Sequence, residues 1–358
     1  GGTITFIAPL ATQPVIAEIY GGGGNTGASY THDYIILFNP TASCFDLSTY
    51  SIQYGSSGSS APTVKGNLTG SIPAGGYYLI KGASNAAIGS ALPDFNIDLS
   101  ASLALGNGAG KVILVNNQTL QANYSNAAIV DFVGYGAGTT SYEGAGPTAS
   151  PSNTSSVRRK SNTGTSTFGV ANAFDSNNNA ADFYLESNII TNAPINNPNI
   201  PTATAATSIL AFTMNANWGA VTAATSYVID VSTSNTFASF VGSYNNFSVG
   251  NVTTYNLTGL SETTQYYYRV RAVKSGRQSC NSNTISATTL SSINTAIDLT
   301  SISSTVNENV GTVTLTFTIN NPSVTLPTTF DLALTGGAGI DADVNNYTTQ
   351  TVTFPANS

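Results

Sequence analysis

Short runs of β-branched and aromatic residues, each ending in a glycine-rich or polar turn, recur through the first part of the chain. Each run has the length and flanking residues of a strand, and these runs lack the 3.6-residue period of an amphipathic helix. They occupy residues 15–20, 33–40, 51–54, 77–80, 111–115 and 129–133. Strands that follow one another without helices between them are typical of an antiparallel β-sandwich, so we expect an all-β fold.

The length of the chain indicates more than one sandwich. Its 358 residues, 41% of them hydrophobic, exceed what one compact core usually takes up, so we expect two or three domains. Three prolines and four asparagines crowd residues 191–201 and leave no strand or helix intact there. We therefore place a first boundary near residue 195 and a short, semi-rigid linker at residues 196–200.

Several blocks in the first half of the chain resemble the bacterial lamin-tail domain and occur in the same order. The blocks are VIAEIYGGGGNTG, DYIILFNP, FDLSTYSIQY, SIPAGGYYLIKG, IVDFVGYG, YEG at 142–144 and DSNNNAADF at 175–183. The resemblance covers residues 13–195 and implies an immunoglobulin-like sandwich, in agreement with the strand pattern. It departs at Ile36, where the family usually has Glu, and at Tyr50, where Trp is common. Residues 1–12 precede it, and we expect them to form an N-terminal strand or extension.

Residues 201–290 resemble a fibronectin type III repeat. Inward and outward residues alternate along three segments, which are residues 226–232, 254–260 and 266–272. Trp218 stands where that family has its core tryptophan, and Tyr266 stands where it has the tyrosine corner. The resemblance implies a second sandwich, which gives tandem immunoglobulin-like β-sandwiches.

Residues 291–358 resemble a Calx-beta domain that is incomplete at its C-terminal end. The matching blocks are STVNENVGTVTLTF at 304–317, GGAGIDAD at 336–343 and VTFPAN at 352–357. Asn346 and Tyr347 stand for the Asp-Tyr that the family usually has. Because a typical copy has further strands, either the sequence belongs to a longer protein or the missing strand comes from another chain.

The residues do not indicate an enzyme. The chain has one histidine, His32, and contains neither a Gly-x-Ser-x-Gly nor a His-Glu-x-x-His motif, neither a phosphate loop nor a two-cysteine metal box. A base held by the adjacent Asp33 is conceivable, but no activated nucleophile is recognisable near it, so we expect His32 to be an ordinary surface residue.

Charge and hydropathy exclude two classes of partner. The one cluster of bases is Arg158-Arg159-Lys160, which we expect to be a solvated turn, so we predict no nucleic-acid binding. No apolar stretch approaches the roughly 20 residues that span a bilayer, and residues 1–6 lack the features of a signal peptide, which indicates a processed, mature form. Cys44 and Cys280 lie 236 positions apart and match no metal spacing, so we expect two lone thiols rather than a bridge.

Calcium is the cofactor that the acidic residues favour, because hard cations bind several oxygen ligands. One segment, starting at Asp175, superficially resembles an EF-hand loop, but Ala180 replaces the required glycine and the lamin-tail ending explains the same residues without metal. The Calx-beta resemblance implies acidic ligands near strand ends in the third domain. The candidate ligands are Asp175, Asn177, Asn179, Glu308, Asp341 and Asp343.

Two pairs of adjacent tyrosines suggest a binding surface. Tyr77 and Tyr78, like Tyr267 and Tyr268, stand on predicted strands, so we expect one tyrosine of each pair to point outward. Exposed tyrosines stack on sugars or anchor protein contacts. The alternative is that they are half-buried residues of a sheet.

These features predict a non-catalytic, modular protein that is secreted or displayed on a bacterial cell surface and serves adhesion or structural assembly. Its partners would be other surface proteins or copies of itself. An accessory region of a secreted hydrolase or nuclease, with its catalytic domain elsewhere, and a polysaccharide-binding module are the alternatives. Donation of the strand at residues 3–8 to the incomplete third domain of another copy would build a filament, unless the sequence simply stops there.

Overall fold

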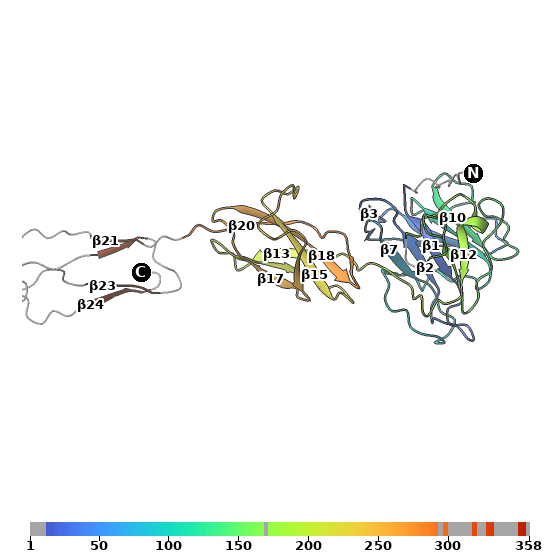
Figure 1. Ribbon diagram of the computed structural model, residues 1–358, viewed down its shortest axis with the longest axis horizontal. Coiled ribbons are helices and arrows are strands. Elements are labelled where there is room, and N and C mark those ends of the chain that lie inside the picture. The colour runs from blue at the N-terminus through green and yellow to red at the C-terminus, as the bar shows by residue number, and fades with distance from the viewer. Residues whose placement is uncertain are drawn as a thin grey trace, which may run out of the picture. The chain divides into compact units, whose positions relative to one another are not determined.

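A computed structural model describes residues 12–167, 171–292, 296–299, 317–320, 327–332 and 350–355. The chain divides into two compact units, which are each described by themselves. The first contains residues 1–208, 214–259 and 265–287, and the second contains residues 209–213, 260–264 and 288–358. Regular structure in the described residues is almost entirely β, with one four-residue helix, α1 (Asn179–Asp182) (Figure 1). The predicted all-β fold of tandem sandwiches is confirmed.

The first sandwich packs a six-stranded sheet against a four-stranded one. The larger sheet has the order β12-β11-β1-β2-β7-β8, and the smaller has the order β10-β9-β4-β5. The bounds of the larger sheet are β1 (Val15–Tyr20), β2 (Tyr34–Phe38), β7 (Tyr77–Lys81), β8 (Ile97–Asp98), β11 (Ser156–Arg159) and β12 (Phe183–Glu186). Those of the smaller are β4 (Ser51–Gly55), β5 (Val64–Asn67), β9 (Gly110–Val115) and β10 (Ile129–Tyr135). Neighbours run antiparallel except β7 and β8, and a short pair, β3 (Phe45–Asp46) with β6 (Ser71–Ile72), lies apart.

The larger sheet is buried on both faces. Its inner face contributes residues such as Ile35, Leu37 and Ile80 to the core between the two sheets. A register shift in β1 between Ile16 and Glu18 places Ile16 and Ile19 in that same core. The outer face carries a second apolar layer of Val15, Ala17, Tyr20, Tyr34, Ile36, Phe38, Tyr77 and Leu79, which Ala173 and Ile189 join. Strands covered on both sides need apolar residues at nearly every position, as β1 and β2 have.

This double cover corrects one prediction about the tyrosine pairs. Tyr78 belongs to the inner core and Tyr77 to the outer layer, so both are buried and neither points into solvent. In the second pair, Tyr268 is buried and Tyr267 is partly exposed, as alternation predicts.

The second sandwich has a three-stranded sheet, β13-β14-β17, and a five-stranded sheet in which β16-β15-β18-β19 follow one another and β20 also pairs with β18. The bounds are β13 (Ala203–Thr207), β14 (Met214–Trp218), β15 (Ser226–Ser232), β16 (Phe247–Gly250), β17 (Thr254–Leu257), β18 (Gln265–Lys274), β19 (Arg277–Gln278) and β20 (Ile285–Thr288). Along β14 and β18, alternate residues are buried. Trp218 is one of them, and its ring centroid lies 5.7 Å from that of Tyr227, which agrees with its predicted place in the core.

The second unit contains two antiparallel pairs of strands in its described residues. β21 (Ala296–Leu299) pairs with β22 (Phe317–Asn320), and β23 (Thr328–Leu332) pairs with β24 (Gln350–Phe354). The strand expected at residues 3–8 and most of that at residues 304–317 lie outside the described residues. The Calx-beta resemblance, the domain boundaries and strand donation therefore stay predictions. No helix within the described ranges has the length and apolar character to cross a membrane.

Candidate functional site

The arginine pair predicted to form a solvated turn lies inside the first sandwich. Arg158 stands on β11 opposite Glu18 of β1, and its guanidinium binds that carboxylate at 2.7 Å. Glu186 of β12 binds the same guanidinium at 3.1 Å, and the Tyr34 hydroxyl donates to Glu18 at 2.7 Å. The prediction was wrong because the neighbouring strands bring carboxylates to these positions, and buried charges require such partners.

Arg159 points to the opposite face of β11 and ties three strands together. One of its terminal nitrogens donates to both carboxylate oxygens of Asp131, at 2.8 and 2.7 Å, and its Nε donates to the carbonyl of Ile16 at 2.8 Å. The backbone N–H of Ile16 in turn donates to Asp131 at 2.6 Å. The side chains of Arg159 and Asp131 are both fully buried (0% exposed). Their ion pair, which contains two hydrogen bonds, is therefore inaccessible to water and connects β10 and β11 with β1.

The three calcium candidates in the first unit take part in the fold. Asp175 lies 3.3 Å from the guanidinium of Arg159, and Asn177 has a left-handed backbone with φ of 54°. The buried carboxamide of Asn179 accepts from Gly134 and Glu143 and donates to Phe132 and Glu143, which uses all four of its hydrogen-bonding positions.

No group of three or more His, Cys, Asp or Glu side chains among the described residues has the arrangement of a metal site. The other candidates, Glu308, Asp341 and Asp343, lie outside the described residues. Calcium binding therefore stays a prediction.

His32 is partly buried, and its Nδ1 lies 2.8 Å from the hydroxyl of Thr31. Burial, and then the charge of Lys81, lower the pKa of His32. The carboxylate of Asp33 accepts from the backbone N–H groups of Gly23 and Leu105, at 2.8 and 2.9 Å. Asp33 thus joins two loops of the sandwich.

An open cavity of about 570 Å³ lies beside β10. Its lining consists of Tyr124, Ser125, Asn126, Ile129, Phe132, Thr140, Ser141, Tyr142 and Glu143. Tyr142 is 37% exposed. Burial, and then the charges of Asp131 and Asp175, raise the pKa of Glu143 to about 8. At neutral pH this carboxyl group is therefore largely protonated and able to donate a hydrogen bond.

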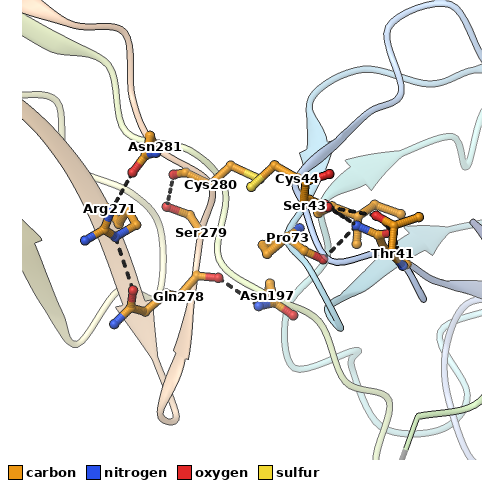
Figure 2. The surroundings of a disulfide bond; sticks show 12 residues. Thr41, Ser43, Cys44, Pro73, Asn197, Arg271, Gln278, Ser279, Cys280 and Asn281 are labelled. Atoms are coloured by element: carbon orange, nitrogen blue, oxygen red, sulfur yellow. Dashed lines mark hydrogen bonds between the residues drawn. A yellow bond between two sulfur atoms is a disulfide. The ribbon is translucent and has the colours of Figure 1, made fainter. Parts of the chain in front are cut away.

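A disulfide joins the two sandwiches of the first unit. Cys44, which follows β2, is bonded to Cys280, which follows β19, and their Cα atoms lie 6.0 Å apart (Figure 2). The prediction of two lone thiols was wrong, because a separation of 236 positions does not keep two modules apart when the chain between them folds back. Cys44 is exposed, whereas Cys280 is buried.

Polar residues of both sandwiches and of the linker contact one another near this bridge. We call the bridge and these residues the junction; the residues are Asp94, Asn196, Asn197, Lys274 and Gln278. The Asn197 side chain accepts from the backbone of Tyr77 at 2.9 Å and donates to the carbonyl of Gln278 at 2.8 Å (Figure 2). The Lys274 ammonium donates to the Asp94 carboxylate and to the side-chain oxygen Oδ1 of Asn196, both at 2.6 Å. Two asparagines of the predicted linker, Asn196 and Asn197, are thus buried and hydrogen-bonded to both sandwiches, whereas Asn199 is exposed.

The two sandwiches define a modular protein of tandem immunoglobulin-like β-sandwiches. Residues 8–137 match the family model of the Lamin Tail Domain, which confirms that resemblance for most of the first sandwich. A search of the curated proteins found no match. The Calx-beta assignment and a bacterial origin stay predictions.

Among solved structures, fibronectin type III domains match. An FN3tt mutant is 26% identical, with 25% of this chain and 94% of that chain covered and a TM-score of 0.22. A Fn3-like protein from Clostridium thermocellum is 30% identical, with 24% and 90% covered and a TM-score of 0.20. The FN5 domain of Drosophila Lar is 22% identical, with 26% and 99% covered and a TM-score of 0.22.

Proposed function

We propose that the chain is the attachment or assembly part of a secreted or cell-surface protein and has no catalytic role of its own. The observation that carries the proposal is the Cys44–Cys280 bridge. Disulfides form and persist in oxidising compartments and are rare where cytosolic reductants keep thiols reduced. The bridge therefore supports a location outside the cytosol.

The arrangement of the first unit supports a scaffold. Its buried charges, Arg158 and Arg159 with their acidic partners, hold strands of one sandwich together. The junction holds that sandwich to the next by a covalent bond and by the hydrogen bonds of Asn197 and Lys274. A fixed relation between two modules keeps their surfaces preorganised for a partner, such as another surface protein or a second copy of this chain.

Labelling of producing cells tests the location. An antibody against the first sandwich should stain intact cells or detect the protein in the medium, and peptide mapping without reductant should recover the Cys44 and Cys280 peptides as one linked species. Staining that appears only after permeabilisation, with both thiols free, would contradict the proposal.

The second candidate function is polysaccharide binding at the cavity beside β10. The exposed ring of Tyr142 offers a face for a sugar, and the neighbouring hydroxyl, amide and carboxyl groups offer hydrogen bonds. We expect a glycan array to give a hit that Tyr142→Ala and Glu143→Ala each weaken at least tenfold. Tyr267→Ala, which removes a partly exposed tyrosine of the other sandwich, is the matched control. Binding unaffected by the two cavity variants would exclude this site.

A further inference from the structure

The bridge encloses most of the first unit in one covalent loop. Every described strand from β3 to β19 lies between Cys44 and Cys280 in the sequence, including all of the four-stranded sheet and the linker. In the described part of this unit, only β1 and β2 precede the loop and only β20 follows it. A force applied at the two chain ends therefore cannot extend the backbone inside the loop while the bridge is intact.

We propose that the Cys44–Cys280 bridge is a tension-bearing link, which passes force from one sandwich to the next and keeps residues 45–279 from extending. This mechanical function goes beyond attachment, because it assigns the path along which force crosses the protein. Noncovalent strand pairs and hydrogen bonds yield one after another under tension, whereas the disulfide must be cleaved chemically before the loop can open.

The strands outside the loop are anchored to residues inside it. β1 lies between β11 and β2 in the sheet, so both of its edges are hydrogen-bonded. At its centre, the backbone of Ile16 donates to Asp131 and accepts from Arg159, and Glu18 binds Arg158. At the other end, β20 pairs with β18, which also lies inside the loop. Tension thus has to break buried ion pairs before β1 leaves the sandwich.

The loop sets a length that can be measured. A separation of 236 positions corresponds to about 800 Å of extended chain, at roughly 3.4 Å per residue. The described residues that flank the loop, from residue 12 to Cys44 and from Cys280 to residue 292, correspond to about 150 Å by the same rule. Residues outside these ranges contribute equally whether the bridge is open or closed.

Single-molecule pulling of the full chain, with a handle at each end, tests the proposal. The oxidised protein should release about 800 Å less contour length than the Cys44→Ser/Cys280→Ser variant pulled in the same way. At constant force, addition of a small thiol reductant should lengthen the oxidised protein in one abrupt event of about that size, because Cys44 is exposed. The variant should not respond to the reductant.

Equal contour lengths for the oxidised protein and the variant would overturn the proposal, as would a reductant response in the variant. If the variant fails to fold, the wild type supplies the comparison, because the same molecules are measured before and after reduction. Circular dichroism of the variant separates a folding defect from a mechanical one. These outcomes do not depend on the cell-surface location, so attachment and force transmission can fail separately.

Discussion

Neighbouring residues of a strand point to opposite faces, and Arg158 and Arg159 use this to place one guanidinium on each side of β11. Each is buried and each has an acidic partner. Removing one partner of a buried ion pair leaves an uncompensated charge, which is usually far more harmful than replacing the whole pair with apolar groups.

We expect Asp131→Asn to lower the free energy of unfolding by about 3–5 kcal/mol, because Arg159 would lose its fully buried counterion and keep only the partly exposed Asp175. Urea denaturation measures this. Asp98→Asn is the matched control: Asp98 pairs with Lys81 at the surface with 43% of its side chain exposed, so we expect a loss of less than about 1 kcal/mol. Similar losses of unfolding free energy in the two variants would show that the buried ion pair stabilises the fold no more than the surface pair does.

Glu143 makes stability depend on pH. Its pKa is about 8 in the folded protein, against an ordinary value of 4.5 for a glutamate, so the unfolded chain releases this proton at lower pH than the folded one. The contribution of this group to stability is therefore lost as the pH rises from about 4.5 to about 8. We expect Glu143→Gln, relative to wild type, to gain up to about 5 kcal/mol between about pH 4 and about pH 9, at roughly 1.4 kcal/mol for each unit of the pKa difference. Thermal unfolding across this range checks it, and a pH-independent difference contradicts it.

On strand β18, two adjacent tyrosines have opposite environments. The hydroxyl of buried Tyr268 accepts from the backbone N–H of Asn217 and donates to the carbonyl of Thr204, which links β18 to the facing sheet. The hydroxyl of Tyr267, in contrast, donates to the side-chain oxygen of Gln265 at the surface. We expect Tyr268→Phe to cost about 1–2 kcal/mol of unfolding free energy and Tyr267→Phe almost nothing. Equal effects in chemical denaturation would refute this difference.

Strands are the part of the fold that the sequence predicts well. The run at residues 15–20 coincides with β1, because Pro14 and four glycines bound a stretch of strand formers. Which faces are covered is not a local property. Tyr77 belongs to the same buried apolar layer as Ala173 and Ile189, which lie about a hundred positions later in the chain. Alternation along β7 carries no information about that layer.

The site was harder to predict for the same reason. Arg158 and Glu18 are 140 positions apart, and the two cysteines are 236 apart. A partial signal existed, because Glu18 and Asp131 each interrupt an apolar strand and a buried carboxylate requires a cation. The two cysteines carried a second signal, which the expectation of lone thiols overlooked: a chain expected to be secreted meets the oxidising conditions in which disulfides form.

At the scale of the whole molecule, the bridge couples the stability of two sandwiches. Closing a loop of this length lowers the conformational entropy of the unfolded chain, which stabilises the folded state by roughly 5 kcal/mol. Strain in the folded state and residual structure in the unfolded state usually reduce the measured stabilisation to about 2–5 kcal/mol. We expect Cys44→Ser/Cys280→Ser to lower the unfolding free energy by that amount in calorimetry without reductant. Wild type with reductant should behave like the variant. An unchanged melting temperature in both would show that the bridge adds no stability.

The positions of the two cysteines also set an order of events during synthesis. Cys44 leaves the ribosome 236 residues before Cys280, which at typical elongation rates is an interval of about 10–50 s. The first sandwich needs no residue beyond β12 to complete its two sheets, so it can fold while its exposed cysteine still lacks a partner. Cys44 is a free thiol throughout that interval, and once β12 has been made it lies on a finished module. Until Cys280 follows, pairing between nascent chains competes with the correct bridge.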